Sequence, residues 1–239
     1  RLLSENPLHD VVWPREKNPR RPVASHQRYL GTIGRADEVD PAGRLRAVLA
    51  LARWTGRRES AICKLRASDL LLSDERIRAA LASEGMDERL ADHMPHGAIR
   101  WAAEADKLGL LFVTPINQEA RAELDRYLRR AARLGDVPLF PAPGAKRKKG
   151  APPPQPAPEK PIGKRLASRW LVSAEELARL PKIQQGVFHP YRRLWASERK
   201  HHPDVDVAAS GGWRDTRALK LSYQQADPET VLKVVEGRS

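Results

Sequence analysis

Apolar residues along most of the chain recur at the three- and four-residue intervals of α-helices. The stretch from Asp40 to Gly56 predicts one helix, and residues 59–65 predict a short second one. Residues 117–134 show the clearest amphipathic pattern, with Asn117 as the N-cap. We expect one helix or a pair of helices over 74–92. Further helices are expected over 173–180, 189–201, 214–223 and 228–235.

Short apolar runs between these helices predict a small sheet. Residues 70–72 form one candidate strand. Residues 98–102 and 110–114 read as the two strands of a hairpin, whose turn at 106–109 contains Lys107. The predicted fold class is therefore mainly α with a small antiparallel β-sheet (α+β).

Two segments lack any such periodicity. Residues 1–22 are rich in proline, arginine and asparagine and predict an extended basic linker arm. Residues 141–162 are rich in proline and lysine and predict a flexible insert, too poor in apolar residues to pack. We expect one domain over 23–239 that this insert interrupts, in a fragment whose N-terminal part is missing, because the chain begins at Arg1 without a methionine.

The charge of the chain points to a polyanionic partner. The 43 Lys and Arg residues exceed the 30 Asp and Glu residues, which gives a formal net charge of +13, and neutralised phosphates release counterions that drive association. The single cysteine, Cys63, excludes an internal disulfide and a cysteine-rich zinc site, and we expect a buried structural thiol. His201 and His202 have no metal-ligand spacing with His189, so no metal and no other cofactor is expected. No apolar run approaches the ~20 residues that span a bilayer, so we expect a soluble, cytoplasmic protein without a membrane partner, in a bacterium or in the host cell of a phage.

Four segments contain residue types suited to phosphate chemistry. Arginine offers a planar fork for two phosphate oxygens, and the tryptophan indole offers a single N–H donor. His189 and Arg192 lie three residues apart at an expected helix start and therefore share a face. The four segments are TGRRESAICKLRASDL, AEADKLGLLFVTPI, FHPYRRLWASE and GGWRDTRALKLSYQQAD.

In this order the segments resemble the signature of the tyrosine recombinases, the phage-integrase type of DNA strand-transfer enzyme, over nearly the whole chain. The family order is arginine, lysine on a hairpin, His-x-x-Arg, a second histidine or tryptophan, and tyrosine. The matching residues here are Arg58, Lys107, His189, Arg192, Trp213 and Tyr223. Among the tyrosines, Tyr127 belongs to a helix's apolar face, Tyr191 lies inside the histidine motif and Tyr29 precedes every motif, which leaves Tyr223 as the nucleophile.

The resemblance implies the DNA breaking-rejoining fold of the family's catalytic domain and a reaction on double-stranded DNA. Tyr223 would form a 3′-phosphotyrosyl link, and Lys107 would protonate the leaving 5′ oxygen. The other site residues would hold the phosphate, and His189 would also assist deprotonation of the tyrosine. The resemblance further implies a homo-tetramer on paired DNA sites, with contacts between protomers from a tail that starts near Asp227. The additional segments 74–92 and 141–162 favour integration or excision of a mobile element.

Two departures from the family pattern keep alternatives open. Ala61 stands where the family often has an acidic residue, so a supporting carboxylate would have to come from elsewhere, Glu59 included. The spacing from Trp213 to Tyr223 is ten residues, longer than the usual one. The alternatives are a catalytically silent DNA-binding protein of the same fold, a type IB topoisomerase, and an unrelated basic protein that packages nucleic acid.

Overall fold

Helix α2 (Arg44–Thr55) lies at the centre of the structure, a computed structural model. The structure describes residues 21–102, 112–144, 159–184 and 186–224, together with 231, 234 and 235. Glycines with positive φ flank α2, Gly43 at 80° and Gly56 at 65°, a backbone region that only glycine enters without strain. The apolar residues that predicted this helix are all at most 1% exposed: Leu45, Val48, Leu49 and Ala52.

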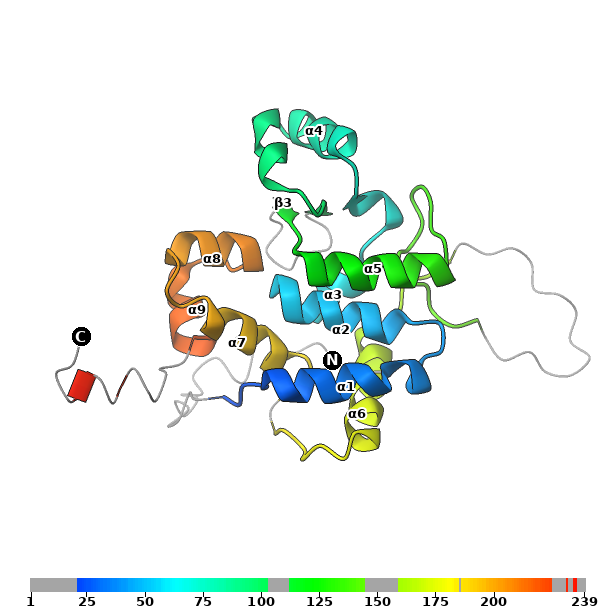
Figure 1. Cartoon of the computed structure of the whole chain (residues 1–239), viewed down its shortest axis with the longest axis vertical. Coiled ribbons are helices and arrows are strands. Elements are labelled where there is room, and N and C mark those ends of the chain that lie inside the picture. The colour runs from blue at the N-terminus through cyan, green and yellow to red at the C-terminus, as the bar shows by residue number, and fades with distance from the viewer. Residues whose placement is uncertain are drawn as a thin grey trace, which may run out of the picture.

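Three longer helices surround α2. Helices α1 (His26–Val39) and α5 (Gln118–Arg130) run on either side of it in Figure 1, and α6 (Lys164–Leu177) packs on α1 and α2. The short α3 (Glu59–Cys63) follows α2 directly and contacts α6. Ser25 and Asn117 cap α1 and α5 with their side-chain oxygens. Cys63 is buried in this core, which raises the pKa of its thiol to about 12.

The sheet follows the order β1-β2-β3 and is antiparallel throughout. Strand β1 (Leu70–Leu71) follows the short helix η1 (Ala67–Asp69), and β2 (Ala98–Trp101) pairs with both β1 and β3 (Phe112–Pro115). Between β1 and β2 the chain forms α4 (Asp74–Ser83) and the 3₁₀ helix η2 (Glu88–His93). These two elements bury a small cluster of their own against the sheet, at the top of Figure 1.

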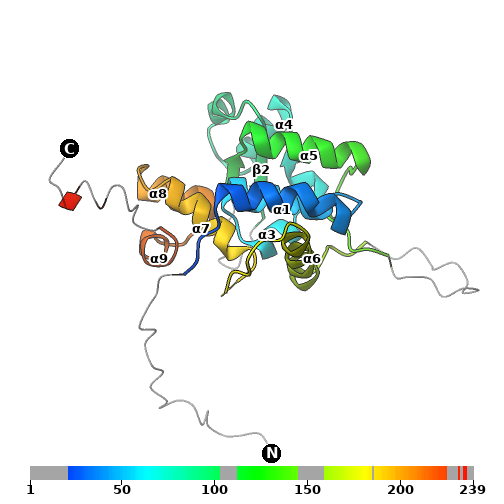
Figure 2. The same cartoon turned by 60° about the horizontal axis from the view of Figure 1, so that its bottom comes forward.

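The last three helices form a group at one side of the molecule (Figures 1 and 2). They are α7 (His189–Glu198), α8 (Asp204–Gly211) and α9 (Thr216–Ser222). Their shared cluster contains Trp195, Val207, Trp213 and Leu219. Helix α7 also packs on α2 and so connects this group to the main core.

The predicted fold class is confirmed, while several boundaries differ. Helices α1 and α8 were not predicted, α6 begins at residue 164 rather than 173, and α5 ends at 130 rather than 134. The ends of the expected insert do pack, because Ile162 is buried and its N–H donates to the Phe140 carbonyl at 2.8 Å. The hairpin turn at 106–109, residues 145–158 and most of the expected helix 228–235 lie outside the described residues. Among the described helices, none has the length and apolar character needed to cross a membrane.

Candidate active site

Arg192, on the first turns of α7, lies at the centre of the candidate site. It is 2% exposed, and its Nη1 donates to the carbonyl oxygen of Gly211 at 2.7 Å and to that of Gly56. Its guanidinium carbon lies 3.6 Å from the centroid of the Trp213 ring. Within the described residues, Arg192 Nε and Nη2 have no hydrogen-bond partner. The side chain is therefore a buried cation with two unused donor atoms.

The electrostatics of Arg192 follow from this burial. None of the ion pairs within the described ranges includes it. Burial lowers the pKa of Arg192 to about 9, and the positive charges of Arg58 and Arg57 act in the same direction. The guanidinium is still protonated at neutral pH, so an arriving anion meets an uncompensated positive charge.

Arg58 is placed by the tight turn between α2 and α3. It is the N-cap residue of α3, and its Nη1 donates to the Gly212 carbonyl at 3.3 Å. The turn requires glycine at position 56, since a Cβ there would lie 2.4 Å from Trp195 Cε3. Unlike Arg58, the neighbouring Arg57 is buried: its Nε donates to the Ser210 carbonyl at 2.9 Å. The structure therefore gives Arg57 a packing role and leaves Arg58 partly exposed at the site.

Trp213 and Tyr223 meet beside Arg192. The Trp213 ring is 4% exposed and stacks on Trp195, with ring centroids 5.9 Å apart and an interplanar angle of 18°. Tyr223 approaches Trp213 edge-on at 4.8 Å and lies 5.1 Å from the Arg192 guanidinium carbon. The Trp213 Nε1 is buried and has no partner in the described part of the chain. The indole N–H is thus a third unused donor at this place.

The ten-residue spacing from Trp213 to Tyr223 is accommodated by α9. Asp215 caps this helix by accepting from the Ala218 N–H at 2.7 Å, and Tyr223 follows as its C-cap residue. The Tyr223 side chain is only partly buried, whereas Tyr29, Tyr127 and Tyr191 are at most 5% exposed. Tyr223 is therefore the tyrosine that remains accessible to a substrate.

His189 begins α7, one turn before Arg192. The residue is exposed overall, yet its imidazole lies partly among protein atoms and close to several arginines. Burial first, and then the charges of Arg193, Arg192 and Arg58, lower the pKa of His189 to about 4. At neutral pH the imidazole is therefore uncharged, and the same burial and charges make it a weaker base than a free histidine.

The remaining expectations for the site concern Lys107 and a carboxylate. Lys107 lies outside the described residues. Trp101, the last residue of β2 before that gap, contacts Arg57: its ring centroid lies 4.9 Å from the guanidinium carbon. Ala61 is buried. Glu59 accepts a hydrogen bond from Ser168 of α6 at 2.8 Å, and burial raises the pKa of its carboxyl. In the described ranges, no group of three or more His, Cys, Asp or Glu residues is arranged to hold a metal ion.

The sequence motifs did not reveal the backbone groups that shape the site. The carbonyls of Gly56, Gly211 and Gly212 orient the two arginines. A signal was present in the Gly211-Gly212 pair, because a Cβ at Gly211 would lie 1.9 Å from Trp213 Cζ3 and Gly212 has a φ of 72°. Five of the six predicted site residues, all except Lys107, are thus described by the structure and lie in one connected cluster.

Comparisons with known proteins agree with this architecture. No protein-family model matches the sequence, and no curated protein matches it either. The XerA recombinase has a similar structure, with a TM-score of 0.60 and 14% identity over 96% of this chain and 70% of that one. The XerH site-specific recombinase in a post-cleavage complex with its difH substrate gives 0.59 and 13%, over 90% and 52%.

A lambda integrase dimer bound to a COC′ core site gives a TM-score of 0.56 and 18% identity, over 89% of this chain and 53% of that one. The chain thus spans 70% of the XerA chain and about half of the other two. At these identities the likeness concerns the fold. From Arg21 to Gln224, as far as it is described, the chain has the fold of the tyrosine recombinases.

Proposed function

We propose that this chain is the catalytic part of a site-specific recombinase that cuts and rejoins double-stranded DNA through Tyr223, in the integration or excision of a mobile element. The observation that carries the proposal is the buried guanidinium of Arg192, two of whose donor atoms have no partner among the described residues, next to the accessible Tyr223. The chemistry follows from the groups around this pair.

The unused donors suit the phosphate of a DNA strand. Nonbridging phosphate oxygens accept strong hydrogen bonds from guanidinium groups, and Arg192 and Trp213 together offer three buried N–H-bearing atoms without partners in the described chain. Arg58 adds a second guanidinium from the turn between α2 and α3. Donors fixed in a dry site stabilise negative charge as it builds on the phosphate in the transition state.

The strand-transfer step then needs only groups of this chain. The Tyr223 hydroxyl attacks only once its proton is removed, and the uncharged imidazole of His189 would accept that proton. The phenolate oxygen attacks phosphorus, and the bond from phosphorus to the 5′ oxygen breaks. Lys107 donates a proton to that oxygen, which leaves a 3′-phosphotyrosyl link and a free 5′ hydroxyl. Attack by another 5′ hydroxyl reverses the step and conserves the bond energy.

The distribution of charge supports a DNA duplex that lies across the face formed by α3 and α6. Lys164, Arg165 and Arg169 of α6 line an open hollow together with Glu59, the residue after Arg58. These cations are exposed, and the charge of Lys164 also acts on the Glu59 carboxylate. They are available to backbone phosphates, which provide most of the affinity and position the protein on DNA.

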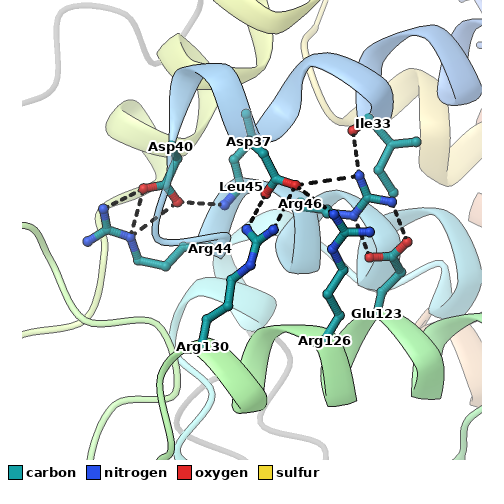
Figure 3. Close-up of polar contacts among 9 residues, drawn as sticks. All are labelled: Ile33, Asp37, Asp40, Arg44, Leu45, Arg46, Glu123, Arg126 and Arg130. Atoms are coloured by element: carbon teal, nitrogen blue, oxygen red, sulfur yellow. Dashed lines mark hydrogen bonds and ion pairs between the residues drawn. The ribbon is translucent and has the colours of Figure 1, made fainter.

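The charges between α1, α2 and α5 behave differently (Figure 3). Arg130 and Arg126 both contact Asp37, at 2.6 and 3.2 Å, and Arg46 contacts Glu123 at 2.6 Å. The arginines there are all paired with carboxylates of the same cluster. The contrast favours the face formed by α3 and α6 as the one that meets DNA. One structural neighbour is a lambda integrase tetramer bound to a Holliday junction, and we propose a homo-tetramer on paired DNA sites for this protein too.

The test is formation of a covalent adduct on suicide DNA that carries the ends of the host element. The full-length protein is incubated with this DNA, and detergent-stable protein–DNA product is measured. We expect adduct with the wild type and none with Tyr223→Phe. Tyr127→Phe is the matched control, because it also removes one hydroxyl, which donates to the Leu139 carbonyl at 2.7 Å far from the phosphate donors.

Salt-sensitive DNA binding without an adduct in the wild type would contradict the proposal. That outcome would identify a DNA-binding protein of the same fold without strand-transfer activity.

A further inference from the structure

The helix that carries His189 and Arg192 is fastened on its other side by a buried polar network. Tyr191 is completely buried, and its hydroxyl donates to Glu175 Oε1 of α6 at 2.7 Å. The same hydroxyl lies 3.1 Å from Thr32 Oγ1 of α1 and accepts from it when the Thr32 proton points that way, so it contacts two helices. Tyr191 touches neither Trp213 nor Tyr223 in any aromatic contact of the described residues.

Glu175 is in turn held by Arg28. The Arg28 Nε and Nη2 atoms donate to the two carboxylate oxygens at 2.9 and 2.7 Å, and Nη1 donates to the Pro181 carbonyl at 2.8 Å. Thr32 Oγ1 also lies 2.8 Å from the Arg28 carbonyl, so its single proton serves either this oxygen or the Tyr191 hydroxyl. One connected set of hydrogen bonds therefore joins α1, α6, the segment after α6 and the first turn of α7.

We propose that the Tyr191–Glu175–Arg28 network positions the first turn of α7, so that His189 and Arg192 reach the DNA phosphate in the correct orientation. The proposal rests on the proposed function and adds three positioning residues that do not touch the substrate. Arg28 and Glu175 lie outside the motif segments, and Tyr191 occupies one of the two unspecified positions of His-x-x-Arg.

The physical reason lies in the direction of the bonds. An apolar contact allows α7 to rotate about its axis with little loss, whereas the hydroxyl of Tyr191 has to reach a carboxylate that Arg28 holds from two sides. Functional side chains need to stay within about 10–20° of the productive geometry. Because Tyr191 and Arg192 are adjacent on one helix turn, fixing the first fixes the direction of the second.

Burying the Arg28–Glu175 ion pair costs desolvation free energy, so stability alone does not explain it. A well-packed apolar set often stabilises a protein as much as a buried ion pair does, and Arg28 and Glu175 have side chains only 7% and 14% exposed. Desolvation, followed by the charge of Glu175, raises the pKa of Tyr191, so its hydroxyl stays protonated and serves as a donor. The network therefore contributes fixed geometry.

The first test compares Tyr191→Phe with Tyr29→Phe in single-turnover cleavage of the suicide DNA. Tyr29 is an equally buried tyrosine of the same core, whose hydroxyl accepts from Trp54 Nε1 at 3.3 Å. We expect Tyr191→Phe to lower the rate at saturating DNA by about 10- to 100-fold, the scale of a misplacement near 1 Å. The DNA concentration at half-saturation should stay unchanged, and Tyr29→Phe should cleave like the wild type. Equal losses in both variants, or no loss in Tyr191→Phe, would overturn the proposal.

A second readout does not depend on activity. The ring-proton titration of His189, followed by NMR in the free protein, reports first how far the imidazole is buried and then how close it lies to Arg193, Arg192, Arg58 and Arg21. We expect the His189 pKa to rise toward 6.5 in Tyr191→Phe and to stay near 4 in Tyr29→Phe. If the wild type forms no adduct, the proposed function fails, and this titration alone decides whether the network orients α7.

The positioning role can still be tested if Tyr191→Phe does not fold. Should Tyr191→Phe not fold, Thr32→Val removes the other hydrogen bond of the same hydroxyl with little change in volume. A smaller rate loss and a smaller rise of the His189 pKa support the proposal, and an unchanged titration overturns it.

Discussion

Replacing Trp213 with phenylalanine separates the volume of the indole from its N–H group. The ring lies between Trp195 and the Arg192 guanidinium, at 5.9 and 3.6 Å. Its Nε1 atom is buried and has no partner in the described part of the chain. A phenyl ring keeps an aromatic face in this stack and removes only the donor and part of the ring.

The expected effect on stability is small. Truncating a buried tryptophan to alanine costs about 3–5 kcal/mol, and we expect this for Trp213→Ala. In Trp213→Phe most contacts persist, and the lost ring atoms are partly offset because a buried N–H without a partner carries a penalty of about 1–3 kcal/mol. We therefore expect the free energy of unfolding of Trp213→Phe to stay within about 1 kcal/mol of the wild type.

The expected effect on cleavage is large. If the indole N–H donates to a phosphate oxygen in the transition state, its removal resembles the loss of one oxyanion-hole donor, which lowers rates by about 10²–10³-fold. Single-turnover adduct formation on suicide DNA at saturating protein measures this rate, and urea unfolding measures the stability of the same preparations.

Trp195→Phe is the matched control. Its Nε1 already donates to the Trp54 carbonyl at 2.9 Å, so this variant loses a hydrogen bond that serves packing. We expect it to cost about 1 kcal/mol or more of stability and to cleave at close to the wild-type rate. A Trp213→Phe protein that cleaves as fast as the wild type would refute the role given to the indole N–H.

Three further predictions concern stability in chemical denaturation. Gly56→Ala should lose about 2–4 kcal/mol, from its φ of 65° and from overlap with the Trp195 ring at 2.4 Å; a loss below about 0.5 kcal/mol contradicts this. Asn117→Ala should lose about 1 kcal/mol with the cap of α5, whereas exposed Gln118→Ala serves as the control. Although burial opposes it, hydrogen bonds and charges of arginines lower the pKa of Asp37. Its contribution to stability is therefore present above pH ~4 and lost as the pH falls further. In Asp37→Asn the free energy of unfolding should depend less on pH in this acidic range.

Hydrophobic periodicity predicted the elements whose buried residues are apolar and regularly spaced. Helix α2 was found because its apolar residues are the centre of the core, and α5 because Asn117 and a regular stripe mark it. The three strands were found because short apolar runs alternate with turns. In these segments the local pattern and the tertiary environment agree.

The missed elements bury residues that look polar in a sequence. Helix α1 buries the polar Arg28 and Thr32 beside Tyr29, Ile33 and Ala36. It also contains Gly31 and Gly34, so its apolar stripe is short and mixed with polar residues. Helix α8 is eight residues long and leaves Val205 71% exposed. The polar network on α7 was equally hidden, because nothing in the sequence indicates that Glu175 and Tyr191 meet. Contacts between segments so far apart follow from the fold.

In the candidate site, the motifs predicted which residues are present, but only the structure shows how each charge is surrounded. Arg192 differs in this respect from two other buried arginines. Away from the site, Arg28 and Arg53 are buried and each has a glutamate partner, Glu175 and Glu198. Arg192 is equally buried and is held only by glycine carbonyls and an aromatic face. These groups orient the guanidinium without neutralising it, whereas a carboxylate in their place would compete with the phosphate for the same donors. What suits Arg192 to an anion is the combination of this burial with two donor atoms that have no partner among the described residues and with the accessible Tyr223 beside them.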